Sequence, residues 1–458
     1  MRGFVPTPPA LVDMMVGKLF DRFPPTLDST VLDPGCGAGA FVGGLLRWCR
    51  RNSVPVPHIR GIEADSSNAA VARTHFATAR SVTIHDADFL TSSAECFDYI
   101  VGNPPYVPIT ELDDTERQAY RKAYLSARGR FDLYLLFFEQ ALNMLRPGGR
   151  LVFVTPEKFL YVESAAPLRR LLGEVVVEEL HFVDEATFPG LVTYPVVTTV
   201  TRSRSCSVTQ VILRDGTRRT VPRVSGSGSW LPRINGASEP SGGPTLADIC
   251  RRVSCGVATG ADRAFLVSRD GLEPALRRFA YPTIAGRQLG PGKGLQPVHA
   301  LLVPYDRDGV LLPEDQLDQL GTYLAEPNRR AALMARTCVA RKPWYAYHES
   351  PPLDVALRPK ILCKDIGAAP YFVVDESGEI LPRHSVYYIV PKDAAAIHDL
   401  AGYLNSPAPQ RWLRSHCQRA ANGFIRLQSH VLKHLPVPAD MSDASREGLE
   451  LNLVGRSA

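Results

Sequence analysis

The sequence lacks a long hydrophobic run. No apolar stretch in its 458 residues approaches the roughly 18 residues expected of a membrane span, and residues 1–9 lack the apolar core of a signal peptide. We therefore expect a cytoplasmic protein that does not contact a membrane. With 45% hydrophobic and 22% charged residues, the composition is that of an ordinary soluble protein. The length predicts about two or three domains.

Metal-binding patterns are also missing. None of the nine cysteines belongs to a Cys-x-x-Cys pair, and no cysteine and histidine cluster has the spacing of a zinc site. The closest pair, Cys250 and Cys255, is isolated from other potential ligands in the sequence. We expect the cysteines to be reduced and mostly structural, with no bound metal. Internal repeats are absent as well.

Charge is present but unevenly distributed. Residues 1–200 contain 19 Lys and Arg against 23 Asp and Glu, whereas residues 201–458 contain 33 against 24. A basic second half beside a slightly acidic first half indicates that the second half contacts a polyanion. On charge alone, a solvated basic face without a partner remains the alternative.

Strand-like and helix-like segments alternate over residues 1–200. A helical segment at 131–145 is followed by the stop signal "RPGG". Such alternation predicts a Rossmann-like α/β fold, in which a largely parallel sheet has helices on both faces. We expect its last two strands to form an antiparallel hairpin at the sheet edge. The expected strands are residues 29–35, 58–64, 81–88, 97–103, 149–156, 175–183 and 195–201.

The remaining sequence predicts a second domain. Residues 202–244 are rich in Gly, Ser and Pro, which indicates a linker with at most one small hairpin. A mixed α+β pattern rich in Arg, Lys, Tyr and Pro then covers residues 245–438. Residues 439–458 have the composition of a loose tail. We therefore expect one domain over residues 1–201 and a second over residues 245–438.

The stretch "VLDPGCGAGAF" places glycines at a strand-to-helix turn. Gly35 and Gly37 let the backbone turn tightly and approach a ligand closely. A glycine pattern alone is a weak signal. Here, however, Asp33 puts a carboxylate just before the turn, where it would repel a pyrophosphate and attract an ammonium group. The stretch therefore favours a cofactor with a cationic amino-acid end.

Acidic residues also end the next two expected strands. Glu63 in "GIEAD" is placed to accept hydrogen bonds from ribose hydroxyls. In "DADFL", Asp88 is placed to bind the amino group of an adenine, and Phe89 to pack on its ring. Each acidic residue alone is more often a solvated turn residue or a helix cap. Together, three acidic residues at successive strand ends predict a nucleoside site at the carboxyl edge of the sheet.

The fourth expected strand ends in Asn103-Pro104-Pro105-Tyr106. Proline lacks an N–H and restricts the residue before it, so this loop would aim the Asn103 side-chain oxygen and the Pro104 carbonyl at one point. Two acceptors suit an NH₂ group, since holding both hydrogens localises the nitrogen lone pair for attack on an electrophile. Tyr106 offers a flat face to a planar group. The simpler interpretation is a rigid loop.

These motifs, in this order, carry a family resemblance. The stretches "FVPTPPALVDMM", "LDPGCGAGAF", "GIEAD", "DADFL", "GNPPY", "FDLYLLFFEQAL" and "FPGLVTYPVV" resemble the gamma-class, TaqI-like adenine-N6 DNA methyltransferases. Residues 245–438, with "GVATGADRAFLV" and "HVLKHLPVP", resemble the target-recognition domain of that family. The resemblance implies methyl transfer from S-adenosylmethionine to N6 of a flipped-out adenine in double-stranded DNA. It also implies a role in a restriction-modification or related defence system.

The resemblance assigns a set of residues to the cofactor. Thr7 and Pro8, near the N-terminus, would fold over the methionine end of the cofactor. The Asp33 carboxylate and the glycine-rich backbone would hold that end. Glu63 would bind the ribose, and Asp88 would bind the adenine amino group. Phe89 and Pro105 would pack on the adenine ring. The assigned residues are Thr7, Pro8, Asp33, Gly35, Gly37, Ala38, Glu63, Asp88, Phe89 and Pro105.

A second set is assigned to the target adenine. Asn103 and Pro104 would hold the N6 amino group, and Tyr106 and Phe188 would sandwich the flipped base. Flipping costs a few kcal/mol, part of which stacking at about 1–3 kcal/mol per base would offset. The alternatives for Phe188 are that it packs in the core or that Tyr194 stacks on the base in its place. The transfer would need neither a metal nor a covalent intermediate, and the Pro-Cys dipeptide typical of cytosine-C5 enzymes is absent.

Cations with neighbouring aromatics in the basic half are candidate DNA contacts. Such mixtures suit phosphate contact and packing on bases or sugars. Solvated cations and core aromatics are the alternative for any single residue. The candidates are Arg287, Arg341, Lys342, Trp344, Tyr345, Lys360 and Arg426.

Other functions remain open at this point. The "NPPY" tetrad also occurs in protein-glutamine methyltransferases of the HemK type, and it would serve cytosine N4 or an RNA adenine. A basic domain after the catalytic core argues against the HemK type. A DNA-binding subunit without catalysis is an alternative of another class. We expect a monomer, with a restriction endonuclease, if any, on a separate chain.

Overall fold

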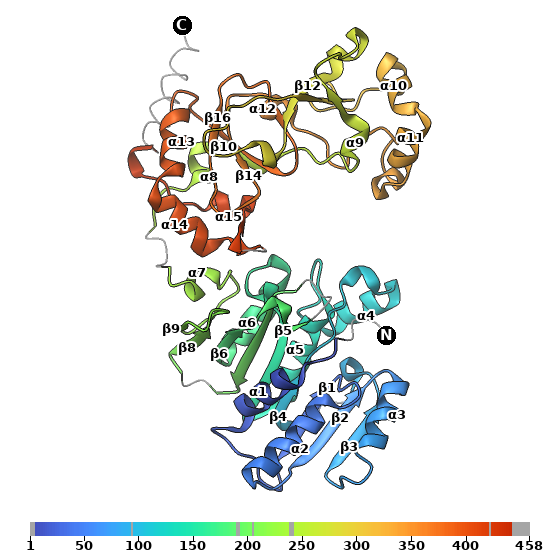
Figure 1. Ribbon diagram of the computed structural model, residues 1–458, viewed down its shortest axis with the longest axis vertical. Coiled ribbons are helices and arrows are strands. Elements are labelled where there is room, and N and C mark those ends of the chain that lie inside the picture. Colours follow the sequence, from blue (N-terminus) through green and yellow to red (C-terminus); the bar gives the residue numbers. More distant parts are fainter. Residues whose placement is uncertain are drawn as a thin grey trace. The chain divides into compact units, whose positions relative to one another are not determined.

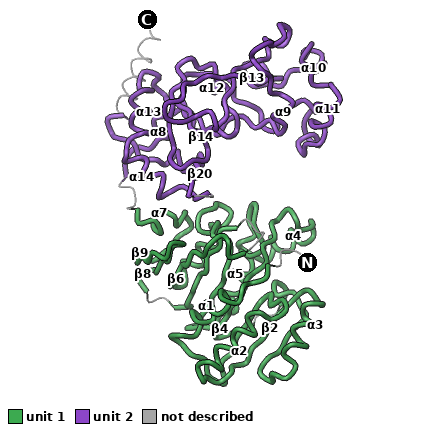
Figure 2. Tube along the Cα trace, in the orientation of Figure 1, with its two compact units in different colours: residues 1–237 green, residues 238–458 purple. Residues whose placement is uncertain are grey.

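The computed structural model describes residues 5–92, 95–188, 193–203, 206–237, 242–420 and 423–441. The chain forms two compact units, residues 1–237 (unit 1) and residues 238–458 (unit 2), which Figure 2 shows in different colours. No helix in the described part of the chain is both long and apolar enough to cross a membrane.

The described residues of unit 1 form a nine-stranded sheet in the order β3-β2-β1-β4-β5-β7-β6-β8-β9 (Figure 1). Neighbouring strands from β3 to β5 are parallel, and β7 is antiparallel to both β5 and β6. The predicted α/β fold is therefore confirmed. The strands are β1 (Thr30–Pro34), β2 (His58–Glu63), β3 (Val82–Asp86), β4 (Phe97–Gly102), β5 (Leu145–Pro156), β6 (Val176–Phe182), β7 (Pro195–Thr201), β8 (Val208–Ile212) and β9 (Arg218–Pro222).

Helices pack on both faces of this sheet. Successive strand residues point to opposite faces. On β1, Val31 accordingly packs in a core cluster with α1 and α2, and Leu32 in another with α5 and α6. Ile100 and Val101 divide in the same way on β4. The helices are α1 (Pro9–Phe20), α2 (Ala40–Asn52), α3 (Ser66–His75), α4 (Asp114–Ala123), α5 (Leu133–Met144), α6 (Ala166–Glu174) and α7 (Leu231–Ile234).

The order of β1 to β4 positions the ligand edge. From β1 the chain proceeds outward to β2 and β3, then returns to the other side of β1 as β4. Ligands of open α/β sheets bind at the carboxyl ends of the strands next to such a reversal. The ends of β1 and β4 therefore define the expected site.

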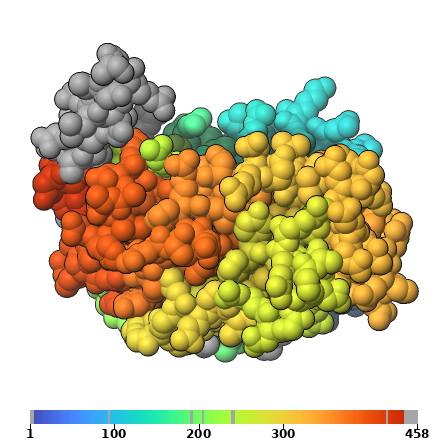
Figure 3. All heavy atoms as spheres, turned by 90° about the horizontal axis from the view of Figure 1, so that it is seen from above, coloured from blue at the N-terminus to red at the C-terminus, as the bar shows by residue number. Residues whose placement is uncertain are grey.

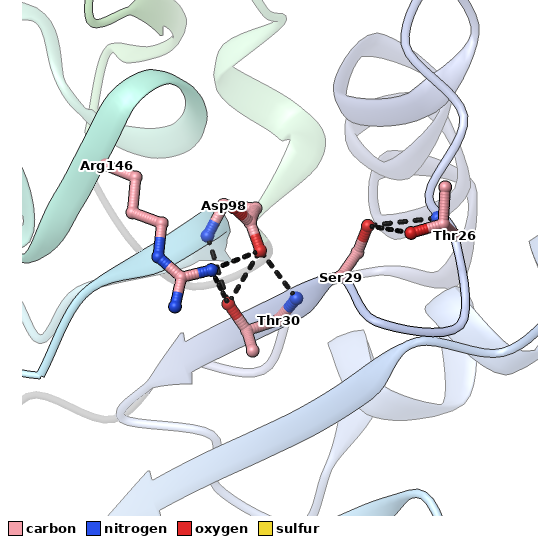
Figure 4. A network of polar contacts seen from close by, with 5 residues as sticks. All are labelled: Thr26, Ser29, Thr30, Asp98 and Arg146. Carbon is pink, nitrogen blue, oxygen red and sulfur yellow. Dashed lines mark hydrogen bonds and ion pairs between the residues drawn. The ribbon is translucent and has the colours of Figure 1, made fainter.

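A polar network joins the opposite, amino-terminal ends of the same strands (Figure 4). The Asp98 carboxylate on β4 accepts hydrogen bonds from the Thr30 backbone N–H and hydroxyl, each at 2.9 Å, and from Arg146 at 2.8 Å. Burial raises the pKa of Asp98, but the hydrogen bonds from Thr30 and Arg146 outweigh burial and hold this pKa below its ordinary value. The network fixes β1 and β4 side by side.

Residues 202–237 contain the one small hairpin that the sequence allowed, but they belong to unit 1 rather than to a linker. They contain β8 and β9, an antiparallel hairpin that extends the sheet through parallel pairing of β8 with β6. The β6–β7 pair is antiparallel as expected, but it is not at the sheet edge. Val211, Val221 and Trp230 are buried in the core of unit 1. Because this part of the sequence is rich in Gly and Ser, it did not indicate that these apolar residues are buried. Unit 1 extends to Ala237, and not to residue 201 as expected.

The described residues of unit 2 form a mixed α+β structure around three smaller sheets, β10-β18-β14-β16, β11-β13-β12-β17 and β15-β20-β19. The strands are β10 (Cys250–Cys255), β11 (Leu266–Ser268), β12 (Ala280–Ile284), β13 (His299–Leu302), β14 (Lys360–Lys364), β15 (Ile366–Gly367), β16 (Val373–Asp375), β17 (Leu381–Pro382), β18 (Val386–Pro391), β19 (Gln418–Arg419) and β20 (Ile425–Arg426). The helices are α8 (Leu246–Ile249), α9 (Asp262–Phe265), α10 (Asp318–Ala325), α11 (Pro327–Met334), α12 (Leu353–Ala356), α13 (Ile397–Asn405), α14 (Pro407–His416) and α15 (Ser429–Lys433). Most of the predicted tail lies outside the described residues.

Candidate active site

A cavity of about 540 Å³ lies at the carboxyl ends of β1 to β4. Its walls come from the turn after β1, the ends of β2 and β3, the loop after β4 and the N-terminal segment 5–7. The short motifs of the sequence therefore meet at one edge of the sheet. The predicted residues that line the cavity are Thr7, Gly35, Ala38, Glu63, Asp88, Phe89, Asn103 and Pro105.

The turn after β1 has the backbone that its glycines permit. Gly35 and Gly37 adopt left-handed conformations, with φ of 77° and 54°. The Gly37 N–H donates a hydrogen bond of 2.8 Å to one Glu63 carboxylate oxygen, and the Asp65 N–H donates one of 2.8 Å to the other. Two backbone donors thus hold the Glu63 carboxylate at the cavity wall.

Asp33 is a buried carboxylate without compensation. Its exposed fraction is 0%, and neither carboxylate oxygen has a hydrogen-bond partner among the described residues. Burial, together with the negative charge of Glu63, raises the pKa of Asp33 well above its ordinary value. Asp33 does not line the cavity itself, but Gly35, two residues later, does. An uncompensated buried carboxylate favours a cationic ligand, so Asp33 fits the ammonium end of S-adenosylmethionine.

The part of the cavity next to β3 suits a planar apolar ring. The Phe89 ring lies 5.0 Å from the Phe137 ring between centroids, and Ile62, Val107 and Leu133 add apolar walls. Asp88 accepts a hydrogen bond of 2.9 Å from the Leu90 N–H. Burial raises the pKa of Asp88, the Leu90 hydrogen bond lowers it and Glu116 raises it further, so the pKa lies above its ordinary value. These residues fit the adenine end of the same cofactor.

The Asn103 amide has its nitrogen end hydrogen-bonded, whereas its oxygen end has no partner among the described residues. Its Nδ2 atom donates to the Val5 carbonyl oxygen and to Thr7 Oγ1, both at 3.1 Å. Its Oδ1 atom is buried and has no hydrogen-bond partner in the described part of the chain. The side chain lines the cavity, so an unpaired acceptor is present at the end of β4.

Several predicted residues do not line the cavity, namely Pro8, Asp33, Gly37, Pro104, Tyr106 and Phe188. Tyr106 is partly buried, and its ring lies 6.3 Å from the Tyr134 ring between centroids. Burial raises the pKa of the Tyr106 hydroxyl above its ordinary value. Phe188 is only 2% exposed and belongs to a core cluster with α1 and α2. In this arrangement Phe188 cannot face a base, which corrects its predicted stacking role; residues 189–192 after it lie outside the described residues.

Other cavity residues were not predicted. Glu116 and Tyr120 lie on α4, which begins with a capping box between Asp113 and Glu116. Leu133 and Phe137 lie four residues apart on one face of α5. The "DDTE" capping signal and the spacing of these apolar residues were visible in the sequence, but neither indicates which face meets a ligand. Cys36 also lines the cavity and lies within the backbone stretch from Gly35 to Ala38 that the resemblance assigned to the cofactor. Further unpredicted lining residues are Val5, Pro6, Ala40, Phe41, Ile62, Ala64, Asp65, Ala87, Val107 and Leu112.

The predicted DNA contacts in unit 2 separate into buried and exposed groups. Lys360 is 0% exposed and ion-paired with Asp375 at 2.6 Å, inside the unit. Tyr345 is 4% exposed, and its hydroxyl donates to the Leu312 carbonyl at 2.9 Å. Both were predicted as DNA contacts, and burial corrects both. Trp344 and Lys342 are partly exposed. Arg287, Arg341 and Arg426 are exposed.

Four cations form what we call the basic surface of unit 2: Arg287, Lys293, Lys364 and Arg426. The Lys293 ammonium donates a hydrogen bond of 3.3 Å to the Arg287 carbonyl oxygen. Gly286, the residue before Arg287, lies close to Lys364, since a Cβ atom placed on this glycine would be 3.1 Å from the Lys364 Cβ. Ile366, two residues after Lys364, pairs with Arg426. Figure 3 shows in space-filling form how segments near residues 280 and 370 adjoin on one face of this unit.

Comparisons with known proteins agree with the fold and with a methyltransferase function. The Eco57I restriction-modification methylase family matches residues 58–188, and the TaqI-like C-terminal specificity domain matches residues 323–437. The chain is 26% identical to the type II methyltransferase M.PaeR7I of Pseudomonas aeruginosa, over 98% of this chain and 88% of that protein. It is 27% identical to M.TthHB8I of Thermus thermophilus, over 79% and 82% of the two chains.

A solved structure shares the fold. The type IIL restriction-modification enzyme MmeI, solved in complex with DNA, has a TM-score of 0.64 and 13% identity, over 96% of this chain and 66% of that longer chain. The matched methylase model and these relatives indicate an S-adenosylmethionine-dependent methyltransferase, and MmeI shares the fold of this chain. More narrowly, residues 58–188 are similar to the Eco57I restriction-modification methylase family, and residues 323–437 are similar to the TaqI-like C-terminal specificity domain.

Proposed function

We propose that this protein is a modification enzyme that methylates N6 of a flipped-out adenine in double-stranded DNA. The observation that carries the proposal is the unpaired Oδ1 atom of Asn103 in the cavity, beside the acidic residues that fit S-adenosylmethionine. The curated relatives are type II methyltransferases, which supports DNA as the substrate. We further propose that the enzyme acts as a monomer, with any restriction endonuclease on a separate chain.

The cofactor supplies a methyl group on a positively charged sulfur. In the proposal, Asp33 neutralises the ammonium end, Glu63 accepts hydrogen bonds from the ribose hydroxyls, and Asp88 accepts one from the adenine amino group. The buried and unpaired state of Asp33 supports the first role, because a carboxylate without a partner is stabilised when a cation pairs with it. Phe89, with Phe137 behind it, would pack on the adenine ring.

The reacting nitrogen would be held by two acceptors. Asn103 Oδ1 and the Pro104 carbonyl would each accept one hydrogen of the target amino group, which withdraws the nitrogen lone pair from the ring and directs it at the methyl carbon. Pro105 contributes no N–H that could compete for these acceptors. Tyr106 would stack on one face of the base after a local adjustment that exposes its ring. The residue on the other face is left unassigned, since Phe188 is in the core.

DNA would bind along the basic surface of unit 2. Arg287, Lys293, Lys364 and Arg426 are cations whose side chains are at least partly exposed, and such a cluster suits phosphate oxygens. Arg341 and Lys342 remain candidates for further phosphate contacts and Trp344 for a base or sugar contact. Lys360 and Tyr345 are not part of this proposal, because both are buried.

The test is to identify the methylated product. The purified protein would be incubated with methyl-labelled S-adenosylmethionine and either mixed duplex DNA or RNA, and each product would be digested to nucleosides. We expect label in N6-methyladenine from duplex DNA. Label in N4-methylcytosine, in RNA or in protein would contradict the proposal and identify the alternative substrate. A protein that binds duplex DNA and the cofactor but transfers no methyl group would instead be a binding subunit.

A further inference from the structure

The N-terminal segment determines which end of the Asn103 amide points away from it. The Val5 carbonyl oxygen lies 3.1 Å from Asn103 Nδ2, and Thr7 Oγ1 lies at the same distance from that atom. The two partners lie almost 100 residues from Asn103 along the chain. Through them, a remote segment contacts the side chain at the end of β4.

The chemistry of these partners fixes the amide orientation. A backbone carbonyl only accepts hydrogen bonds, so the amide group that faces Val5 must be the NH₂ end. The second NH₂ hydrogen is accepted by the Thr7 hydroxyl oxygen. A flipped amide would place Asn103 Oδ1 against the Val5 carbonyl oxygen, exchanging a hydrogen bond for a repulsive contact. Both donors of the amide are therefore used, and Oδ1 is directed elsewhere.

The consequence is an acceptor that is prepared before any substrate binds. Oδ1 is buried and has no hydrogen-bond partner among the described residues, which is costly in the absence of a ligand. The cost is tolerated because the two Nδ2 hydrogen bonds prevent the amide from turning to satisfy the oxygen. An acceptor held in place requires no reorganisation when a donor arrives, which is how fixed polar groups accelerate reactions.

We propose that Thr7 and the Val5 carbonyl are positioning groups, which hold the Asn103 amide with its oxygen toward the amino group to be methylated. This proposal rests on the proposed function. It gives Thr7 a role separate from the cofactor contact that the family resemblance implies, because its Oγ1 atom is bound to Asn103 rather than only facing the cavity. Thr7 would act on the transfer step through Asn103 and not by touching the reacting atoms.

The test replaces the hydroxyl and then restores it. In the full-length protein, Thr7→Val keeps the side-chain shape and removes the acceptor, and Thr7→Ser returns an acceptor without the methyl group. We expect Thr7→Val to lower the single-turnover methylation rate about three- to tenfold, the effect of one lost hydrogen bond, with cofactor affinity changed less than about twofold. Thr7→Ser should recover most of the rate. Thr74→Val, which removes an exposed hydroxyl on α3, is the matched control.

Three results would overturn this inference. They are an unchanged rate in Thr7→Val, a Thr7→Ser variant as slow as Thr7→Val, and a loss of rate explained entirely by weaker cofactor binding. A second measurement does not depend on activity. With asparagine labelled on its side-chain nitrogen, both Asn103 NH₂ hydrogens should exchange slowly in the unaltered protein and faster in Thr7→Val. Fast exchange in the unaltered protein would contradict the positioning role, whereas slow exchange without DNA methylation would contradict only the proposed function.

Discussion

The two units of the molecule assemble their functional side chains in different ways. In unit 1, the polar residues of the cavity follow successive strands of one sheet, and the parallel arrangement of β1 to β4 brings them to one edge. In unit 2, the cations of the basic surface come from separate segments that meet only through tertiary packing. The first arrangement can be recognised in short motifs, and the second cannot.

The difference has an energetic counterpart. A buried group at a reacting centre acts at short range in a medium that screens it poorly, so a single change there has a large effect. Exposed cations act together on a polyanion, and water and salt screen each of them. We therefore expect single substitutions to be severe around the cavity and mild on the basic surface. Substitutions of buried residues in unit 2 should also have large effects, but on stability rather than on DNA binding.

The largest effect is expected for Asn103→Ala. Removing the amide removes the unpaired acceptor at the end of β4, and we expect methyl transfer to fall by about 10³-fold or more, which corresponds to roughly 4 kcal/mol. Binding of S-adenosylmethionine, measured by calorimetry, should change little. Asn52→Ala, which removes an exposed amide from the end of α2, is the control and should keep full activity. Retained transfer in Asn103→Ala would remove the proposed role of this residue.

The next effect is expected for Lys360→Met, and it concerns stability. The Lys360 ammonium and the Asp375 carboxylate form an ion pair of 2.6 Å in which both side chains are almost fully buried. Removing one partner of a buried pair leaves the other charge uncompensated, at a cost of about 3 kcal/mol or more. We expect a lower denaturation midpoint for unit 2, with the exposed Lys433→Met as the control. Normal stability with weakened DNA binding would instead restore Lys360 as a DNA contact.

The sequence was sufficient for strands β1 to β7 and for the polar residues at the ends of β2 to β4, for a physical reason. A residue at the end of a strand can be placed once its strand is recognised, because the carboxyl ends of parallel strands lie at one edge of the sheet. Glu63, Asp88 and Asn103 could therefore be assigned to one edge without knowing any contact. Burial inside unit 2 was not predictable in this way. Lys360 is the first residue of the buried strand β14, and its partner Asp375 lies on β16, so the local run of cations was misleading. The stacking role predicted for Phe188 was wrong as well, because core packing and base stacking both favour an aromatic residue.

Asp33→Asn should have an intermediate effect. The substitution removes the negative charge and keeps the side-chain shape. We expect about 10- to 100-fold weaker binding of S-adenosylmethionine, since one partner of a buried charge pair would be lost. Isothermal titration would measure the affinity. Unchanged binding would show that Asp33 does not pair with the ammonium end of the cofactor.

The same residue predicts a pH dependence of stability. Because burial and Glu63 raise the pKa of Asp33 in the folded protein, the folded state binds the proton more tightly than the unfolded state does. Without cofactor, stability should therefore fall as the pH rises from the ordinary aspartate range through the raised pKa. Asp33→Asn should remove this part of the slope, and saturating cofactor should reduce it in the unaltered protein. Thermal denaturation over a pH series would measure these slopes, and identical slopes in all three samples would contradict the prediction.

The smallest effect is expected for single cations of the basic surface. Arg426→Ala and Arg287→Ala should each weaken binding of duplex DNA by about two- to fivefold, on target and non-target sequences alike. Each loss of a phosphate contact should also make the dependence of log affinity on log salt concentration shallower by about one. Arg278→Ala removes an exposed arginine that is ion-paired with Asp318, so it should leave the salt dependence unchanged. A loss of affinity confined to one DNA sequence would instead place the altered arginine against a base, and unit 2 would then also contain residues whose single effects are large.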